Sequence, residues 1–149
     1  MKRKYILVLF LFLSLFVFVG CNKDEIKVDG TKLVENKDYY VRGEHNVKYL
    51  DLTKRGYYID SLNEPNAPYF YIICMGEQNT DGYWLEVKGI YRTDDNETVV
   101  VVKENTPGEK DVVGQVITYP TLMIEFPTYQ EKITIKNTKG IEFEQLKDY

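Results

Sequence analysis

Cysteine and histidine are scarce in this chain, which has two cysteines and one histidine among 149 residues. Transition-metal sites in proteins use clusters of His and Cys side chains, and His45 has neither a second histidine nor a cysteine cluster beside it. The sequence therefore predicts no metal site and no cofactor held by one. Beyond residue 21 the only cysteine is Cys74, so the fold must be stabilised by its core and not by an internal disulfide.

Basic residues are in the minority once the N-terminal 21 residues are set aside. Residues 22–149 carry 16 Lys and Arg against 23 Asp and Glu, which gives a net charge of −7. A chain with this charge and no dense basic cluster repels phosphate backbones. Nucleic-acid binding is therefore not expected.

Motifs that carry enzymatic chemistry are also missing. The chain has neither a glycine-rich phosphate loop nor a serine nucleophile elbow. Cys74 lies within an apolar run, where a thiol is usually a small buried hydrophobe. The densest acidic group, residues 94–97, lies between two predicted strands and lacks the ligand spacing of an EF-hand loop. We therefore predict that the protein is not an enzyme.

One long apolar run is present, and it lies at the N-terminus. Lys2, Arg3 and Lys4 precede an apolar segment that ends at Gly20 and Cys21, the pattern of a secretory signal helix. Residues 18–21 resemble the lipobox of bacterial lipoproteins, in which the cysteine receives lipid, including palmitate, and becomes the new N-terminus. This resemblance implies lipidation of Cys21 and a cell-membrane protein anchored on the extracytoplasmic face. The alternative is an uncleaved signal anchor in which Cys21 has no role.

The remaining chain divides by composition into a tether and one domain. Residues 22–46 are highly charged and predict a tether with one short strand near 39–41. Fully stretched at ~3.3 Å per residue, this segment would reach roughly 80 Å from the lipid. Residues 47–149 have the length of one β-domain.

From residue 47 onward the hydrophobic pattern has a period of two. It predicts strands at 48–52, 56–59, 69–75, 83–92, 98–103, 121–126 and 132–136. The segment 69–75 is apolar throughout, as expected of a central strand that is covered on both faces. These short strands with turn residues between them predict an all-β fold, either an antiparallel β-sandwich or a barrel-like single domain.

A series of motifs between residues 69 and 127 resembles the C-terminal domain of the PrcB family, subunits of bacterial surface protease complexes. In chain order the motifs are MGE at 75–77, NTDGY at 79–83, LEV at 85–87, KENTPG at 103–108 and TYP at 118–120. The resemblance implies a non-catalytic accessory subunit that binds and stabilises an extracytoplasmic protease. Such a subunit would be recognised by its protein partner and would need no cofactor.

The predicted contacts with that partner lie around a turn. Asp81-Gly82 between two strands is a strong hairpin signal, because glycine tolerates the positive φ of a tight turn. Strand parity places Trp84 with Glu86 and Lys88, opposite a face shared by Tyr83, Leu85, Val87 and Tyr91. An indole on a polar face is a plausible interface contact, with a place over a sheet edge as the alternative. The predicted partner-binding residues are Gln78, Asn79, Thr80, Asp81, Gly82, Tyr83 and Trp84.

Two other functions stay open at this point. Residues 79–84 also resemble a loop of chagasin-type cysteine-protease inhibitors, which insert that loop into the protease cleft, although the two other inhibitory loops of that family are missing here. The many tyrosines are compatible with an envelope carbohydrate-binding module, in which aromatic rings stack on sugars. The first of these alternatives would use the 78–84 loop for inhibition.

Overall fold

The computed structural model describes residues 26–42, 47, 49–62 and 64–147. The predicted signal segment with Cys21, and the single histidine, His45, lie outside the described residues. No helix in the described part of the chain is long and apolar enough to cross a membrane.

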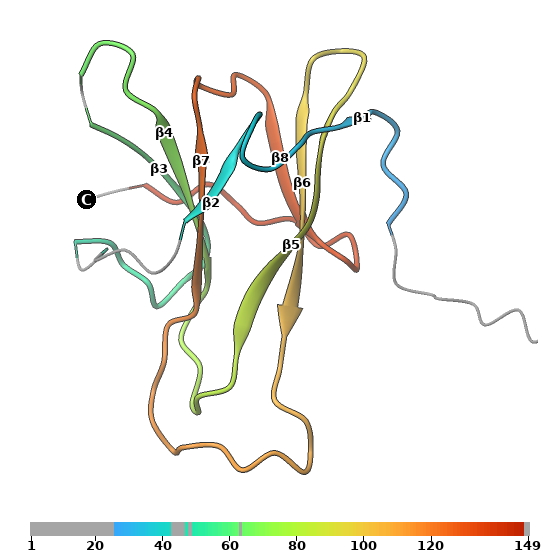
Figure 1. Cartoon of the computed structure of the whole chain (residues 1–149). Coiled ribbons are helices and arrows are strands. Elements are labelled where there is room, and N and C mark those ends of the chain that lie inside the picture. The colour runs from blue at the N-terminus through green and yellow to red at the C-terminus, as the bar shows by residue number, and fades with distance from the viewer. Residues whose placement is uncertain (1–25, 43–46, 48, 63, 148–149) are drawn as a thin grey trace, which may run out of the picture.

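The described strands form two four-stranded sheets (Figure 1). The first, named here the β5–β6 sheet, contains in spatial order β1 (Thr31–Lys32), β5 (Trp84–Arg92), β6 (Thr98–Asn105) and β8 (Ile133–Asn137). The second, the β4–β7 sheet, contains β2 (Tyr40–Arg42), β7 (Thr121–Phe126), β4 (Tyr69–Met75) and β3 (Arg55–Ser61). The sheets do not close into a barrel, so the sandwich prediction is confirmed. The β6–β8 pair is parallel, whereas the other strand pairs of the two sheets are antiparallel.

Side chains from the inner faces of both sheets pack into the main core. The buried members are mostly aromatic and β-branched, as a pleated surface favours, and include Tyr71, Ile73, Ile90, Val100, Val102, Ile124, Phe126 and Ile135. Tyr71 is fully buried there and makes a T-shaped contact with Phe126, at 5.4 Å between ring centroids. Burial raises the pKa of Tyr71 to about 12, and its hydroxyl accepts a hydrogen bond from the backbone N–H of Gln130 at 3.0 Å.

A second apolar cluster covers the outer face of the β4–β7 sheet. Its buried members are Val47, Leu50, Tyr58, Ile72, Cys74 and Met123. Because neighbouring residues of β4 contribute to the two clusters in alternation, β4 is covered on both faces. The prediction of a central strand at 69–75 is therefore confirmed.

The predicted strand at 48–52 is wrong. Residues 49–52 lie in no strand, and the N–H of Leu50 donates to the carbonyl of Val47 at 2.9 Å. The Asp51 carboxylate accepts from the backbone N–H of Thr53 at 3.1 Å, a local bond that competes with a strand ladder. As a result β3 pairs with β4 and not with the preceding segment.

A β-bulge changes which residues of β5 face the core. Val87 pairs with Val102 and Gly89 with Val101, so Lys88 is an extra residue on β5. Beyond the bulge the side-chain parity is reversed, and Ile90 joins the core cluster instead of Tyr91. The prediction that Tyr91 shares a face with Leu85 and Val87 is therefore wrong.

Part of the segment expected as a tether lies within the two sheets. β1 pairs with β5, and β2 pairs with β7. Tyr39, which directly precedes β2, is buried in the main core against Phe126. Residues 26–42 therefore contribute strands and core side chains to the β-sandwich.

Arg55 connects the two sheets at one edge of the sandwich. Its guanidinium donates to both carboxylate oxygens of Glu104 at 2.9 and 3.2 Å, and to the carbonyl of Glu142 at 2.8 Å. The amide of Asn137 donates to the same carboxylate at 2.6 Å. Burial alone would raise the pKa of Glu104, but the hydrogen bonds from Arg55 and Asn137 and the charges of Arg55 and Lys139 outweigh burial and lower this pKa.

Candidate partner-binding surface

Two connections cross between the sheets at the same end of the molecule, seen at the bottom of Figure 1. One runs from β4 to β5 and the other from β6 to β7. We name residues 76–84 and 106–120 together the crossover lobe. The two connections are bonded to each other, because Gln78 and Thr118 exchange both backbone hydrogen bonds at 2.9 Å.

Asp81 and Gly82 fasten the first connection to the second. The N–H of Asp81 donates to the carbonyl of Gly114 at 3.1 Å, and the Asp81 carboxylate accepts from the N–H of Gly114 at 2.7 Å. Gly82 has a φ of 85° and lies so close to Pro107 and Val113 that a Cβ atom would be 3.2 and 3.1 Å from their side chains. Positive φ at Gly82 was expected, but the expected hairpin is wrong, because β4 and β5 lie in different sheets.

The predicted binding residues have different environments. Trp84 is 51% exposed at the start of β5, and Asn79, Asp81 and Gly82 are exposed as well. Gln78 and Thr80 are half-buried, and Tyr83 packs against the main core. The segment 78–84, named here the 78–84 strap, is therefore bonded to the 106–120 connection and is not the exposed tip of a hairpin.

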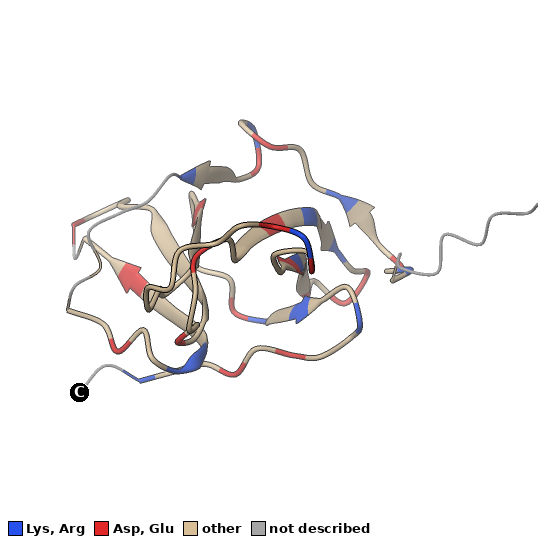
Figure 2. Cartoon of the chain, turned by 90° about the horizontal axis from the view of Figure 1, so that it is seen from below, with Lys and Arg blue, Asp and Glu red and all other residues tan. Residues whose placement is uncertain are grey.

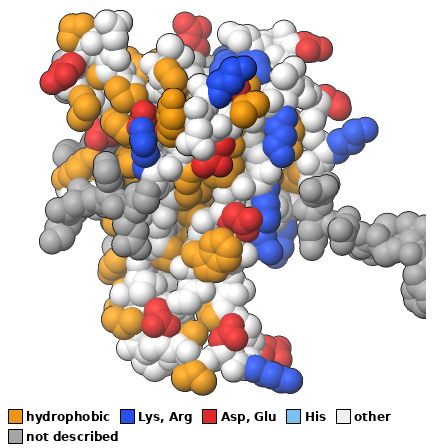
Figure 3. All heavy atoms as spheres, in the orientation of Figure 1, with side chains coloured by type: hydrophobic (Ala, Val, Ile, Leu, Met, Phe, Trp, Pro, Cys, Tyr) orange, Lys and Arg blue, Asp and Glu red, His pale blue; other side chains and the backbone are white. Residues whose placement is uncertain are grey.

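The structure adds apolar residues that the sequence analysis did not single out. These exposed side chains of the second connection are Val112, Val116, Ile117 and Tyr119. Together with Trp84 they are the exposed large apolar side chains described between residues 69 and 127, and orange side chains are visible on the lower part of the molecule in Figure 3. Their signal in the sequence was a pair of apolar dipeptides, at 112–113 and 116–117, in a segment without a predicted strand.

The crossover lobe also carries several carboxylates. The lobe contains Glu77, Asp81, Glu109 and Asp111 against one basic residue, Lys110, and Figure 2 shows acidic residues along the connection that faces the viewer. The Tyr119 hydroxyl donates to Glu77 at 3.2 Å, and partial burial together with this carboxylate raises the pKa of Tyr119. A shallow hollow of about 210 Å³ lies between the two connections and is lined by residues 81–83 and 118–120.

The buried thiol and the acidic residues are the remaining groups considered for chemistry. Cys74 is buried, and burial raises the pKa of its thiol to about 12. Among the described residues no group of three or more His, Cys, Asp and Glu side chains is arranged to hold a metal ion. The described residues thus form an all-β sandwich whose crossover lobe carries exposed apolar side chains.

The sequence comparisons agree with the resemblance seen in the motifs. The family described as PrcB C-terminal matches residues 69–127 of the chain. The matched segment contains β4, β5, β6 and β7 and therefore both connections of the crossover lobe. No curated protein and no solved structure matches the chain.

Proposed function

We propose that this protein is a non-catalytic accessory subunit of an extracytoplasmic protease complex, and that the crossover lobe binds the partner. The family match over residues 69–127 supports association with a protease complex. The basic and apolar pattern of residues 1–21 supports export and anchoring through lipid on Cys21. In this proposal the subunit holds the protease at the extracytoplasmic face of the membrane.

The observation that carries the proposal is the concentration of exposed apolar side chains on the lobe. Trp84, Val116 and Ile117 are each about half exposed, and Val112 is fully exposed. Contiguous apolar surface rimmed by polar residues marks protein contacts, and tryptophan is enriched where such contacts contribute most. The carboxylates of the lobe suit a partner whose apolar contact site is bordered by Lys or Arg.

Rigidity of the lobe would favour tight binding. The 78–118 backbone pair, the Asp81–Gly114 bonds and the bond from the Thr118 hydroxyl to the carbonyl of Thr80 at 2.8 Å hold the two connections together. A loop that is already ordered loses less conformational entropy when it binds. Because the lobe binds the native protease and not its unfolded chain, it would stabilise the protease by mass action.

The test is capture of the partner by lobe variants. Tagged full-length protein is isolated from its host's membranes, and the co-eluting protease is identified and assayed for activity. Trp84→Ala is expected to weaken the affinity about 30-fold, which corresponds to ~2 kcal/mol at an interface hot spot. The affinity of each variant is measured by surface plasmon resonance, because Trp84→Ala removes the only tryptophan of the chain and with it the intrinsic tryptophan fluorescence of this subunit.

Leu62→Ala is the matched control, because Leu62 is 61% exposed but lies outside the lobe and outside residues 69–127. It is expected to bind the protease like the unaltered protein. Equal loss of binding in both variants, or unfolding of Trp84→Ala, would contradict the assignment of the lobe.

The inhibitor alternative predicts a different activity for the captured protease. An accessory subunit leaves the protease active, whereas an inhibitor that inserts residues 78–84 silences it. Titration of papain-like proteases with the full-length protein separates the two, since no inhibition at micromolar concentration would exclude the inhibitor function. Binding to purified cell-wall polymer with no protease in the eluate would favour the carbohydrate module.

A further inference from the structure

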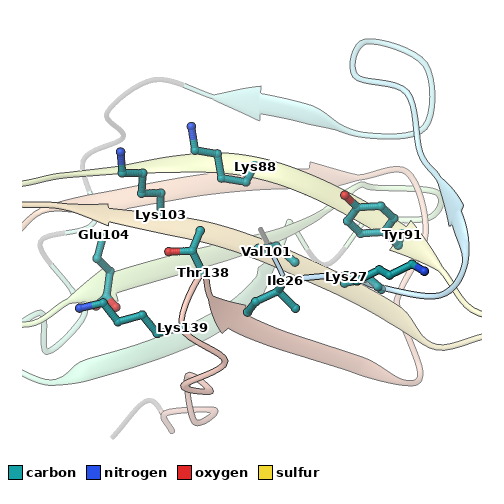
Figure 4. Close-up of a pocket in the computed structure, with 10 residues that line it drawn as sticks. Ile26, Lys27, Lys88, Tyr91, Val101, Lys103, Glu104, Thr138 and Lys139 are labelled. Atoms are coloured by element: carbon teal, nitrogen blue, oxygen red, sulfur yellow. The ribbon is translucent and has the colours of Figure 1, made fainter. Parts of the chain in front are cut away.

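A groove of about 730 Å³ lies on the other side of the β5–β6 sheet from the main core (Figure 4). It is bordered by the N-terminal segment 26–28, the end of β6 and the turn after β8. The residues that line it are Ile26, Lys27, Val28, Lys88, Tyr91, Val101, Lys103, Glu104, Thr138 and Lys139. The bulge at Lys88 contributes to the groove, because it turns Tyr91 away from the core and toward this face.

Four lysines line the groove, although residues 22–149 have a net charge of −7. Lys88 forms an ion pair with Glu86 at 2.7 Å, but Lys27, Lys103 and Lys139 form no ion pair with any residue that the structure describes. These three side chains belong to exposed residues. These three lysines therefore give the groove an excess of positive charge, and their ammonium groups can contact an anion.

The one carboxylate that lines the groove does not cancel this charge. Glu104 is engaged by the guanidinium of Arg55 at 2.9 and 3.2 Å and by the amide of Asn137 at 2.6 Å. Its negative charge is thus balanced mainly by a cation from the other sheet, with a smaller contribution from Lys139. The groove is left positive, and Figure 3 shows Lys and Arg side chains over the part of the molecule that contains β5 and β6.

The position of the groove along the chain indicates what faces it. Ile26 lines the groove and is the first described residue, and it follows Cys21 by five residues. Five extended residues span at most ~17 Å. A lipid on Cys21 would therefore hold the groove within about that distance of the bilayer surface.

We propose that the groove docks onto the phosphate headgroups of anionic phospholipids in the membrane that holds the anchor. The inference rests on the lipid anchor of the proposed function. Lysine ammonium groups are compact charges that suit phosphate, and a basic patch next to a lipid anchor is a second membrane-binding signal. Loss of one groove lysine is expected to weaken docking about five-fold, the effect of one basic residue at an anionic surface.

The experiment places the full-length protein in lipid nanodiscs, with either phosphatidylcholine alone or phosphatidylcholine mixed with phosphatidylglycerol. Lysines are acetylated briefly, and the rate at each site is measured by mass spectrometry. Lys103 and Lys139 are expected to react at least five-fold more slowly in the anionic discs, and high salt is expected to abolish the difference. Lys37 and Lys110, which are exposed but do not line the groove, are the internal controls.

The double variant Lys103→Gln/Lys139→Gln tests the same groove. It has no lysine to acetylate at either altered position, so docking is measured from the acetylation rate of Lys27. Its two substitutions should weaken docking about 25-fold and return the acetylation rate of Lys27 to its value in zwitterionic discs. Lys110→Gln should leave the protection of Lys27 unchanged. Both variants alter exposed side chains, so folding is not expected to change.

The possible results distinguish failure of the lipid anchor from failure of the headgroup docking. The mass of the N-terminal peptide of protein isolated from its host shows whether Cys21 carries lipid, and an unmodified Cys21 overturns the anchor together with the docking that rests on it. Lipid on Cys21 with equal acetylation of Lys103 in both discs overturns the docking alone. Protection that requires the captured protease and not anionic lipid would assign the groove to an acidic peptide, and would also overturn it.

Discussion

Replacing Glu104 by glutamine tests how much the Arg55–Glu104 pair, which connects the two sheets, contributes to the free energy of unfolding. The substitution keeps the shape of the side chain but removes the charge that receives two hydrogen bonds from Arg55 and one from Asn137. Hydrogen bonds to charged groups contribute ~1.5–3 kcal/mol. We take the lower end of this range, because the side chains of Arg55 and Glu104 are 31% and 20% exposed and solvent screens their interaction. We expect Glu104→Gln to lower the free energy of unfolding by about 1.5 kcal/mol at pH 7.

Urea denaturation of the purified protein measures this loss. With a slope of ~2 kcal/mol per molar urea, the midpoint should fall by roughly 0.8 M. The matched control is Glu86→Gln, whose carboxylate pairs with Lys88 at 2.7 Å but at 37–40% exposure on the same sheet. Exposed pairs contribute little, so this control should change the free energy of unfolding by less than ~0.5 kcal/mol.

The pH dependence gives an independent check of the reasoning. The pKa of Glu104 is lowered in the folded protein, so this group stabilises the fold above its unfolded pKa, and the stabilisation is lost as the pH falls through the folded value. The difference between the unaltered protein and Glu104→Gln should therefore shrink toward zero under acid conditions. An equal difference at pH 7 and in acid, or none at pH 7, would refute the role of the charge.

Three further substitutions or probes have defined outcomes. Tyr71→Phe should lower the free energy of unfolding by ~1–3 kcal/mol, because the buried N–H of Gln130 loses its acceptor, and thermal denaturation measures this. Gly82→Ala should cost ~1–3 kcal/mol at a φ of 85°, with a Cβ 3.1 Å from Val113, and should weaken partner capture; unchanged stability and capture would contradict the described turn. Cys74 should resist thiol reagents in the folded protein and react only on unfolding, since it is buried and its pKa is about 12.

Much of the fold could be predicted because it depends on local pattern. The uninterrupted apolar segment that became β4 required cover on both faces, and the structure provides the two apolar clusters around it. Four consecutive valines produced the buried part of β6. The acidic group at 94–97, expected between two strands, lies between the paired strands β5 and β6, with Asn96 at a φ of 65°.

The candidate binding surface was predicted only in part. The exposure of Trp84 followed from strand parity and is confirmed. The contribution of the 112–119 side chains was missed, because this connection has no periodicity that separates an exposed apolar residue from a buried one. Exposure there depends on how the connection lies against the 78–84 strap, which involves residues more than 30 positions away.

By itself, the sequence determined the all-β class, the main strands and the buried thiol, because these depend on composition and on alternation within short segments. Only the tertiary structure decided which sheet each strand joins. Asp81-Gly82 has the chemistry of a hairpin turn, yet the backbone pairing of Gln78 with Thr118 and the bonds of Asp81 to Gly114 direct the chain from one sheet to the other. The lysine groove likewise exists only after folding, since a one-residue bulge and strand pairing bring together side chains from four distant segments, whose proximity no local pattern encodes.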